Sequence, residues 1–249
     1  MFEGLRRKRV LITGASGGLG ACMARLLASY GAAVGLHYKR NARQAAALRA
    51  ELTRQGGEAE TFQGDLLEAR SCRALMGDFL KRFGAIDVLI NNAGAVFGPA
   101  GLEELRAASW DRTFALNARA PFLLAQQAFA RMKRQGGGKI INISSVAVKY
   151  GGSPTTLHYA AAKAALEAVT VGMATAGAPH HILVNAIRAG FIETSFHRAM
   201  GRTDTRSRVA RIPLKRAGRP LDVARLVLFL ASEAGDFITG SIVTVSGGD

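Results

Sequence analysis

Short apolar runs alternate with amphipathic stretches along almost the whole chain, and this alternation most limits what the chain can fold into. The strand-like runs are 9–13, 32–38, 59–63, 87–91, 139–144, 182–187 and 241–245. Helical patterns occupy 21–31, 42–57, 71–84, 109–134 and 156–177. Apolar strands that alternate with helices predict a parallel sheet covered by helices on both faces. We therefore expect a single doubly wound α/β domain over residues 1–249, with about seven strands.

Composition narrows the class of protein further. The chain is 49% hydrophobic and 20% charged, which is typical of a globular protein. No apolar run reaches about 18 residues, so we expect no membrane span. The chain starts without a signal-peptide core, and Cys22 and Cys72 have neither metal-site nor disulfide spacing, which favours the cytoplasm. The net charge is +15, but the basic residues are scattered, so we expect a basic surface and no nucleic-acid partner.

The segment 188–220 interrupts the alternation. It is long, rich in arginine, threonine and glycine, and it follows a predicted strand. Open α/β sheets bind ligands beyond the carboxyl ends of their strands, and long irregular segments in compact domains are often lids. We interpret 188–220 as a substrate loop or lid, with a surface insertion as the alternative.

The stretch TGASGGLG, residues 13–20, lies between the first predicted strand and the first predicted helix. Gly14, Gly18 and Gly20 permit a tight turn, and the N-terminus of the helix directs backbone N–H groups at a pyrophosphate. In a doubly wound chain this pattern predicts a Rossmann-type dinucleotide site.

The end of the second strand bears on which dinucleotide binds. NAD-preferring sites offer a carboxylate there to the ribose 2′-hydroxyl. This chain has Tyr38 at that place, followed by Lys39 and Arg40. Two cations suit a 2′-phosphate, so we expect NADP(H) rather than NAD(H), with a solvated basic turn as the alternative. His37 is expected near the adenosine end of the cofactor.

The stretch LHYAAAKAAL, residues 157–166, places Tyr159 and Lys163 four positions apart on one helix face. Alone, such a pair is most simply a surface contact. Together with other motifs, it resembles a catalytic pair of the short-chain dehydrogenase/reductase family. The motifs that occur in the order of this family are TGASGGLG, GDL at 64–66, NNAG at 91–94, FALNARAPF, INISS, YAAAK and VNAIRAGFIET. The resemblance covers nearly the whole chain.

This resemblance implies an oxidoreductase that transfers a hydride between NADP(H) and a carbonyl or secondary alcohol. It implies that Asn117, Ser145, Tyr159 and Lys163 are catalytic. Together with the residues considered above, the predicted cofactor contacts are Gly14, Ser16, Gly18, Leu19, Gly20, Tyr38, Lys39, Arg40, Asp65, Leu66, Asn92, Ala93, Gly94, Tyr159, Lys163, Ile192 and Thr194. Residues 229–249 resemble the C-terminal segment of the family, and this resemblance implies a homotetramer, or else a dimer.

The predicted chemistry centres on Tyr159 as general acid/base. A free phenol has a pKa of about 10, and a nearby ammonium from Lys163 favours the phenolate and lowers that pKa. Ser145 would donate a hydrogen bond to the carbonyl oxygen, with Ser144 as the alternative. By the resemblance, Lys163 also binds the nicotinamide ribose, and Asn117 helps to hold a water that links Lys163 to solvent. His158 points about 100° away from Tyr159 and is expected on the surface or behind the site.

Three features depart from the family pattern. Ala189 stands where the family has proline, so the backbone there is less restricted. Gly17 replaces a basic residue of many NADP-dependent members, which leaves the 2′-phosphate to Lys39 and Arg40. The loop KYGGSPTT, residues 149–156, contains one residue more than the pattern implies.

Other classes of protein fit less well. A serine hydrolase of this fold would need a G-x-S-x-G elbow, and neither this motif nor HExxH or another metal-ligand cluster is present. Among reductases, length and the FIETSF stretch resemble 3-oxoacyl-[acyl-carrier-protein] reductases. Arg131, Lys133 and Arg134 would then form one basic patch for an acidic carrier protein, with His180 near the second. A non-catalytic nucleotide-binding protein is the remaining alternative.

Overall fold

The computed structural model of the chain describes residues 4–194 and 205–249. Within them, parallel strands form one seven-stranded sheet in the order β3-β2-β1-β4-β5-β6-β7, which confirms the expected doubly wound fold. The strands are β1 (Arg9–Ile12), β2 (Ala33–Tyr38), β3 (Ala59–Gln63), β4 (Val88–Asn91), β5 (Gly138–Ser145), β6 (Ile182–Ala189) and β7 (Ile242–Val245). The strand order reverses between β1 and β4, which is where open α/β sheets bind their ligands.

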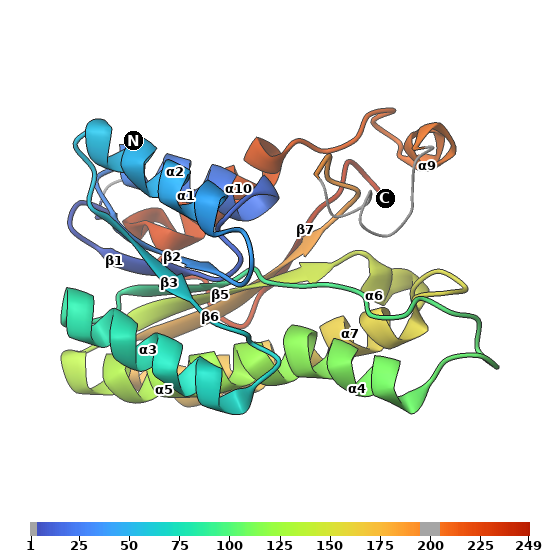
Figure 1. The fold of residues 1–249 in the computed structure, drawn as a ribbon, viewed down its shortest axis with the longest axis horizontal. Helices are drawn as coiled ribbons and strands as arrows, with labels where there is room; N and C mark the ends of the chain where they lie inside the picture. The colour runs from blue at the N-terminus through green and yellow to red at the C-terminus, as the bar shows by residue number, and fades with distance from the viewer. Residues whose placement is uncertain (1–3, 195–204) are drawn as a thin grey trace.

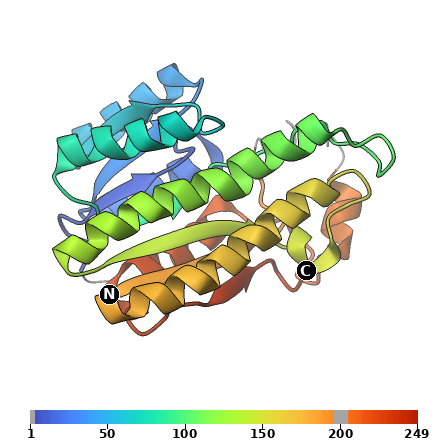
Figure 2. The ribbon, with the colours of Figure 1, turned by 90° about the horizontal axis from the view of Figure 1, so that it is seen from below.

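Helices cover both faces of this sheet (Figure 1). One face carries α1 (Gly18–Ser29), α2 (Ala42–Arg54) and α10 (Pro220–Ala231), and the other carries α3 (Ala69–Phe83), α5 (Ala120–Gln135) and α7 (Leu157–Gly177). Figure 2 shows α5 and α7 running alongside each other over the second face. In the described residues, no helix is both long and apolar enough to cross a membrane.

Each central strand contributes side chains to two separate cores. Val10 and Ile12 of β1 pack with α1 and α10, whereas Leu11 between them packs with α3 and α5. Successive side chains of a strand point to opposite faces, so a strand covered on both sides is apolar at every position. This is the physical reason that short continuous apolar runs marked the strands in the sequence.

The predicted helical stretch 109–134 is divided into three parts in the structure. These are α4 (Ala107–Phe114), the π-helical turn η1 (Ala115–Arg119) and α5. A π turn inserts one additional residue into the helical ladder, and such turns occur frequently at functional sites. Asn117 lies in the middle of this turn.

The segment 188–220 is only partly irregular. Arg188 and Ala189 complete β6, a short helix α9 spans Arg206–Arg211, and α10 begins at Pro220. Residues 195–204 lie outside the described residues. The interpretation of the segment as a substrate lid therefore stays a prediction.

Candidate active site

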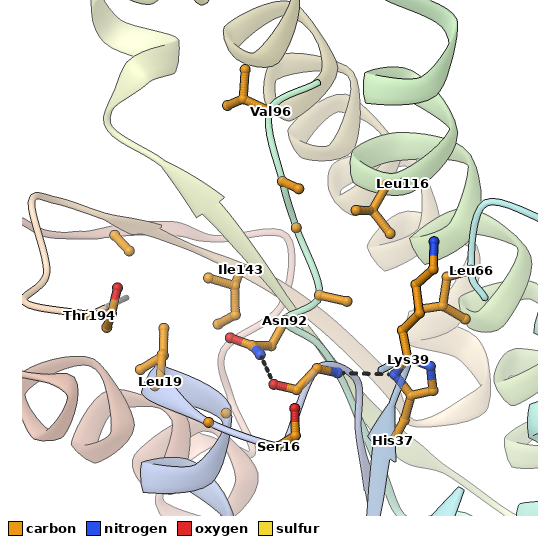
Figure 3. Close-up of a pocket in the computed structure, with 18 of the residues that line it drawn as sticks. Ser16, Leu19, His37, Lys39, Leu66, Asn92, Val96, Leu116, Ile143 and Thr194 are labelled. Atoms are coloured by element: carbon orange, nitrogen blue, oxygen red, sulfur yellow. Dashed lines mark hydrogen bonds between the residues drawn. The ribbon is translucent and has the colours of Figure 1, made fainter. Parts of the chain in front are cut away.

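A cavity of about 620 Å³ lies along the carboxyl ends of the strands. In Figure 3, His37 and Lys39 lie on one side of it, and Thr194 and Leu19 lie on the other. Every residue predicted to contact the cofactor lines this cavity except Tyr38. Successive side chains of an extended segment point to opposite sides. His37 in β2 and Lys39 directly after it point to the cavity, so Tyr38 between them points away from it.

The glycine loop has the geometry that a phosphate cradle requires. Gly14 and Gly18 have φ angles of +65° and +53°, which favour glycine, and α1 begins at Gly18. A Cβ atom on Gly20 would lie 2.3 Å from the carbonyl oxygen of Gly14, so only glycine fits there. The residues present therefore fit a diphosphate bound against the backbone at the start of a helix.

The NNAG motif after β4 holds the glycine loop in place. The side-chain amide of Asn92 donates to the carbonyl oxygens of Thr13 at 2.8 Å and Gly14 at 3.2 Å. In return, the hydroxyl oxygen of Thr13 accepts from the backbone N–H groups of Asn92 and Ala93, both at 2.9 Å. The Asn92 side chain thus fixes the backbone of the glycine loop. The motif alone did not predict this role.

His37 connects three strand ends beneath the part of the cavity next to β2. Its Nδ1 accepts from the backbone N–H of Gly14 at 3.1 Å, which is drawn in Figure 3, and its Nε2 therefore donates to the carbonyl oxygen of Gly64 at 3.1 Å. His37 is 2% exposed. Burial lowers its pKa to about 4, although the Gly64 hydrogen bond and Asp65 act in the opposite direction.

The two cationic candidates at the end of β2 differ in their contacts. The ammonium of Lys39 pairs with the Asp65 carboxylate at 2.6 Å, and both side chains are more than one-third exposed. Burial favours a higher pKa for Asp65, but the Lys39 hydrogen bond and the backbone N–H of Leu67 outweigh it and hold that pKa below its usual value. Arg40 lines the cavity beside this pair.

Tyr159 and Lys163 of α7 both line the opposite end of the cavity. Lys163 is 2% exposed, and its Nζ donates to the carbonyl oxygen of Ile143 at 2.7 Å. The Nζ lies 5.8 Å from the centroid of the Tyr159 ring. Burial lowers the pKa of Lys163 to about 8, and the charge of Glu167, one helical turn further on, opposes this shift.

The two serines at the end of β5 have different partners. The hydroxyl of Ser144 donates to Glu167 at 2.6 Å, and Arg188 also binds that carboxylate through two nitrogens. The hydroxyl oxygen of Ser145 accepts from the N–H of Ala147 at 3.1 Å, which leaves its own proton available as a donor. Both serines line the cavity, but the proton of Ser144 is already donated to Glu167, which favours Ser145 as the carbonyl donor.

Asn117 is fully buried and does not line the cavity itself. Its amide nitrogen donates to the carbonyl oxygens of Ala95 at 2.7 Å and Thr113 at 2.8 Å, and its Oδ1 has no hydrogen-bond partner in the described part of the chain. A Cβ atom on Gly94 would lie 2.9 Å from this Oδ1 and 3.6 Å from the Nζ of Lys163. The absence of a side chain at Gly94 therefore leaves room beside both polar groups.

Ala189, which stands where the family has proline, lies in a strand end that is fixed by hydrogen bonds. The carbonyl oxygen of Ala189 accepts from Val146 at 3.0 Å, and the N–H of Gly190 donates to Val245 at 2.9 Å, so pairing with both neighbours fixes the backbone without proline.

His158 is fully buried and its Nε2 lies 2.9 Å from the carbonyl oxygen of Phe97, which places it behind the site rather than on the surface.

Several lining residues were not predicted from the sequence. They include Val96 and Phe97 after the NNAG motif, Leu116 in η1 and Ile143 in β5. No residue type or spacing marks them, since their shared property is their position beside the strand ends.

The fold and this cavity define a class of protein, the α/β oxidoreductases that bind a dinucleotide along the carboxyl ends of parallel strands. A family model described as enoyl-(acyl carrier protein) reductase matches residues 14–249. A 3-oxoacyl-[acyl-carrier-protein] reductase of Staphylococcus aureus is 34% identical over 241 residues, which is 97% of each chain. The chain belongs to the short-chain dehydrogenase/reductase family, whose members are NAD(P)-dependent oxidoreductases.

Solved structures agree with this placement. A blue fluorescent protein from a metagenomic library, in complex with NADPH, superimposes with a TM-score of 0.93 at 34% identity over 99% of both chains. A 7α-hydroxysteroid dehydrogenase, complexed with NADH and 7-oxo glycochenodeoxycholic acid, gives a TM-score of 0.92 at 32% identity over 100% of this chain and 98% of the other. The two similar proteins thus bind different forms of the cofactor.

Proposed function

We propose that the chain is an NADP(H)-dependent carbonyl reductase, or in the reverse direction a secondary-alcohol dehydrogenase, with Tyr159 as general acid/base. One observation carries the proposal. The cavity that begins at the glycine loop ends at Ser145, Tyr159 and Lys163, three groups that together donate to a carbonyl oxygen and supply it with a proton.

When bound, the nicotinamide supplies the hydride that reaches the carbonyl carbon. The hydroxyl of Ser145 then donates a hydrogen bond to the carbonyl oxygen and holds the substrate. The phenol of Tyr159 gives its proton to the oxygen as negative charge develops there, and the product is the alcohol. The buried ammonium of Lys163 stabilises the phenolate that remains. Asn117 is proposed to hold a water beside Gly94 through which Lys163 exchanges protons with solvent.

The preference for NADP(H) rests on the end of β2. Lys39 and Arg40 line the cavity there, where NAD-preferring sites have a carboxylate. Asp65 already neutralises Lys39, so Arg40 is the stronger attraction for a 2′-phosphate, and Lys39 would share its charge between Asp65 and the phosphate.

The substrate is proposed to be a small-molecule ketone or secondary alcohol. A 3-oxoacyl thioester on an acyl-carrier protein is the second candidate, favoured by the family model and by the Staphylococcus aureus relative. Assembly into a homotetramer, or a dimer, is the expected state of the enzyme, and the cytoplasm is its expected location.

The primary test measures carbonyl-dependent loss of NADPH absorbance by the wild type and Tyr159→Phe. We expect kcat to fall by about 10²–10⁴-fold, because the proton donor is lost. Tyr30→Phe is the matched control, since Tyr30 lies outside the cavity at the end of α1, and it should keep wild-type activity. Equal activity of wild type and Tyr159→Phe would refute the mechanism.

A substrate panel separates the remaining alternatives. It should contain simple ketones, steroid ketones and a 3-oxoacyl thioester, each with NADPH and with NADH. Turnover of the thioester well above the others would establish the carrier-protein candidate. Tight NADPH binding without turnover of any carbonyl would instead favour a non-catalytic nucleotide-binding protein.

A further inference from the structure

Asp249 joins two segments that are distant in the sequence but lie together on the substrate side of the sheet. Its carboxylate is 6% exposed and accepts from two guanidinium nitrogens of Arg208 on α9, one of them at 2.9 Å from Oδ1. The same Oδ1 lies 3.4 Å from the hydroxyl of Tyr150, the last residue of α6 (Ala147–Tyr150). Figure 1 shows the C-terminal mark between α9 and α6.

The backbone around Asp249 is held by the same two segments. Its main-chain oxygen accepts from the ammonium of Lys149 on α6 at 2.9 Å and from the hydroxyl of Ser246 at 3.0 Å. Two residues earlier, the carbonyl oxygen of Gly247 accepts from the N–H of Leu214 at 3.1 Å. Residues 246–249 thus lie between α6 on one side and residues 205–214 on the other.

Each of these segments leads directly to a wall of the cavity. On one side, the N–H of Ala147 in the first turn of α6 donates to the hydroxyl oxygen of Ser145. On the other, Gly218 pairs with the segment after β6. Its N–H donates to the carbonyl oxygen of Phe191 at 2.9 Å, and its own carbonyl oxygen accepts from the N–H of Glu193 at 2.8 Å. Asp249 therefore connects the serine wall to the wall that follows β6.

We propose that Asp249 is a positioning residue for the substrate. By holding α9 against α6, its carboxylate fixes the wall after β6 relative to the Ser145 hydroxyl that would receive the carbonyl. The inference rests on the proposed reductase function. It assigns no role in cofactor binding to Asp249, because the residue does not line the cavity.

The test compares Asp249→Ala, Arg208→Gln and the double variant with the wild type in steady-state kinetics. Each single variant should raise the KM for the carbonyl substrate about tenfold, because a partly buried ion pair is lost and the two walls of the cavity are no longer held together. The KM for NADPH should rise less than the KM for the carbonyl, because only Ile192 and Thr194 of the predicted cofactor contacts lie on the wall after β6. The double variant should be no worse than Asp249→Ala alone, because that variant already removes the ion pair with Arg208.

Two further variants show whether the ion pair itself is responsible. Arg208→Lys keeps one charged contact and should recover most of the affinity for the carbonyl. Arg211→Gln removes an exposed arginine from the same helix and should behave as wild type. Additive effects of the two single variants, or a loss of thermal stability with an unchanged KM for the carbonyl, would overturn the proposal.

Hydrogen exchange on the cofactor-free protein separates this inference from the proposed function. Asp249→Ala should speed exchange at the N–H groups of Lys149 and Gly152 near α6 and of Val209 in α9, and leave those of α2 unchanged. If the wild type turns over no carbonyl, the reductase proposal fails, and this result alone then decides whether Asp249 links the two segments. Unchanged exchange in both segments would overturn the link.

Discussion

The two ends of the cavity place their charges in opposite environments. At the end next to β2, proposed as the adenosine end, Lys39 and Asp65 form an ion pair in which the side chains are 38% and 37% exposed. At the other end, proposed as the catalytic end, Lys163 is 2% exposed, and the neutral amide of Asn117 near it is 0% exposed. Exposed pairs are screened by water and salt and contribute little free energy, whereas a buried ammonium loses its hydration and responds strongly to each neighbour.

This difference supports the two functions proposed for the site. An exposed charge can be exchanged with little effect on folding, so the adenosine end is suited to selecting between NADP(H) and NAD(H). The buried groups have their pKa values and orientations set by the protein, which proton transfer requires. Substitutions at the two ends should therefore affect different kinetic constants.

The largest effect is expected for Lys163→Met, which keeps the length of the side chain and removes its charge. Without the ammonium, the phenolate of Tyr159 loses its stabilisation, and kcat should fall by about 10²–10⁴-fold. Stopped-flow or steady-state NADPH oxidation measures this. Lys81→Met, on the exposed face of α3, is the control and should keep the wild-type kcat. A comparable loss in both variants would show that the effect does not come from the buried ammonium of Lys163.

The next largest effect is a pH dependence of stability that comes from His37. This side chain is buried beneath the exposed pair of Lys39 and Asp65. Its pKa is about 4 in the folded protein and ordinarily 6.5, so between these values the unfolded chain binds the additional proton. The free energy of unfolding should therefore rise with pH from about 4 to 6.5, by about 3 kcal/mol, or roughly a hundredfold in the unfolding equilibrium.

The variant His37→Asn tests this assignment. Its side-chain oxygen can still accept from the N–H of Gly14, but it does not titrate. Urea unfolding of both proteins at about pH 4.5, 5.5, 6.5 and 7.5 should show a smaller rise for the variant. Parallel pH curves for the two proteins would contradict the shifted pKa.

The smallest effect is expected for the double substitution Lys39→Ala and Arg40→Ala. The KM for NADPH should rise about tenfold, because the charges proposed to face the 2′-phosphate are removed. The KM for NADH and kcat should stay near their wild-type values. Arg54→Ala, an exposed arginine at the far end of α2, is the matched control. An equal rise in the KM for both cofactors would show that these cations do not select between them.

Much of the fold was predictable because its signals are local. The strand 59–63 has the predicted bounds, and the others agree to within a few residues, since apolar runs between turn residues reflect burial on both faces of the sheet. The predicted helices did not include α10, whose apolar residues come directly after the irregular segment. The division of 109–134 by η1 was also missed, because a π turn leaves no mark in residue type.

The site was predictable where residue types carry the chemistry, as with Ser145, Tyr159 and Lys163. Their catalytic roles remain predictions. The hydrogen bonds by which Asn92, His37 and Asp249 hold neighbouring segments were not predictable. Each of them joins residues more than twenty positions apart in the sequence. Such contacts depend on the topology of the sheet rather than on any local pattern.

The π turn at 115–119 takes up one additional residue within the helix, so the residues of α5 face the sheet as they would in an uninterrupted α-helix. Removing one residue from η1 should restore a continuous α-helix and leave Leu124, Ala128 and Met132 buried against the sheet. The same deletion should move the Asn117 amide away from the carbonyl oxygens of Ala95 and Thr113. The additional residue is therefore needed for the placement of Asn117, while the folding of α5 does not depend on it.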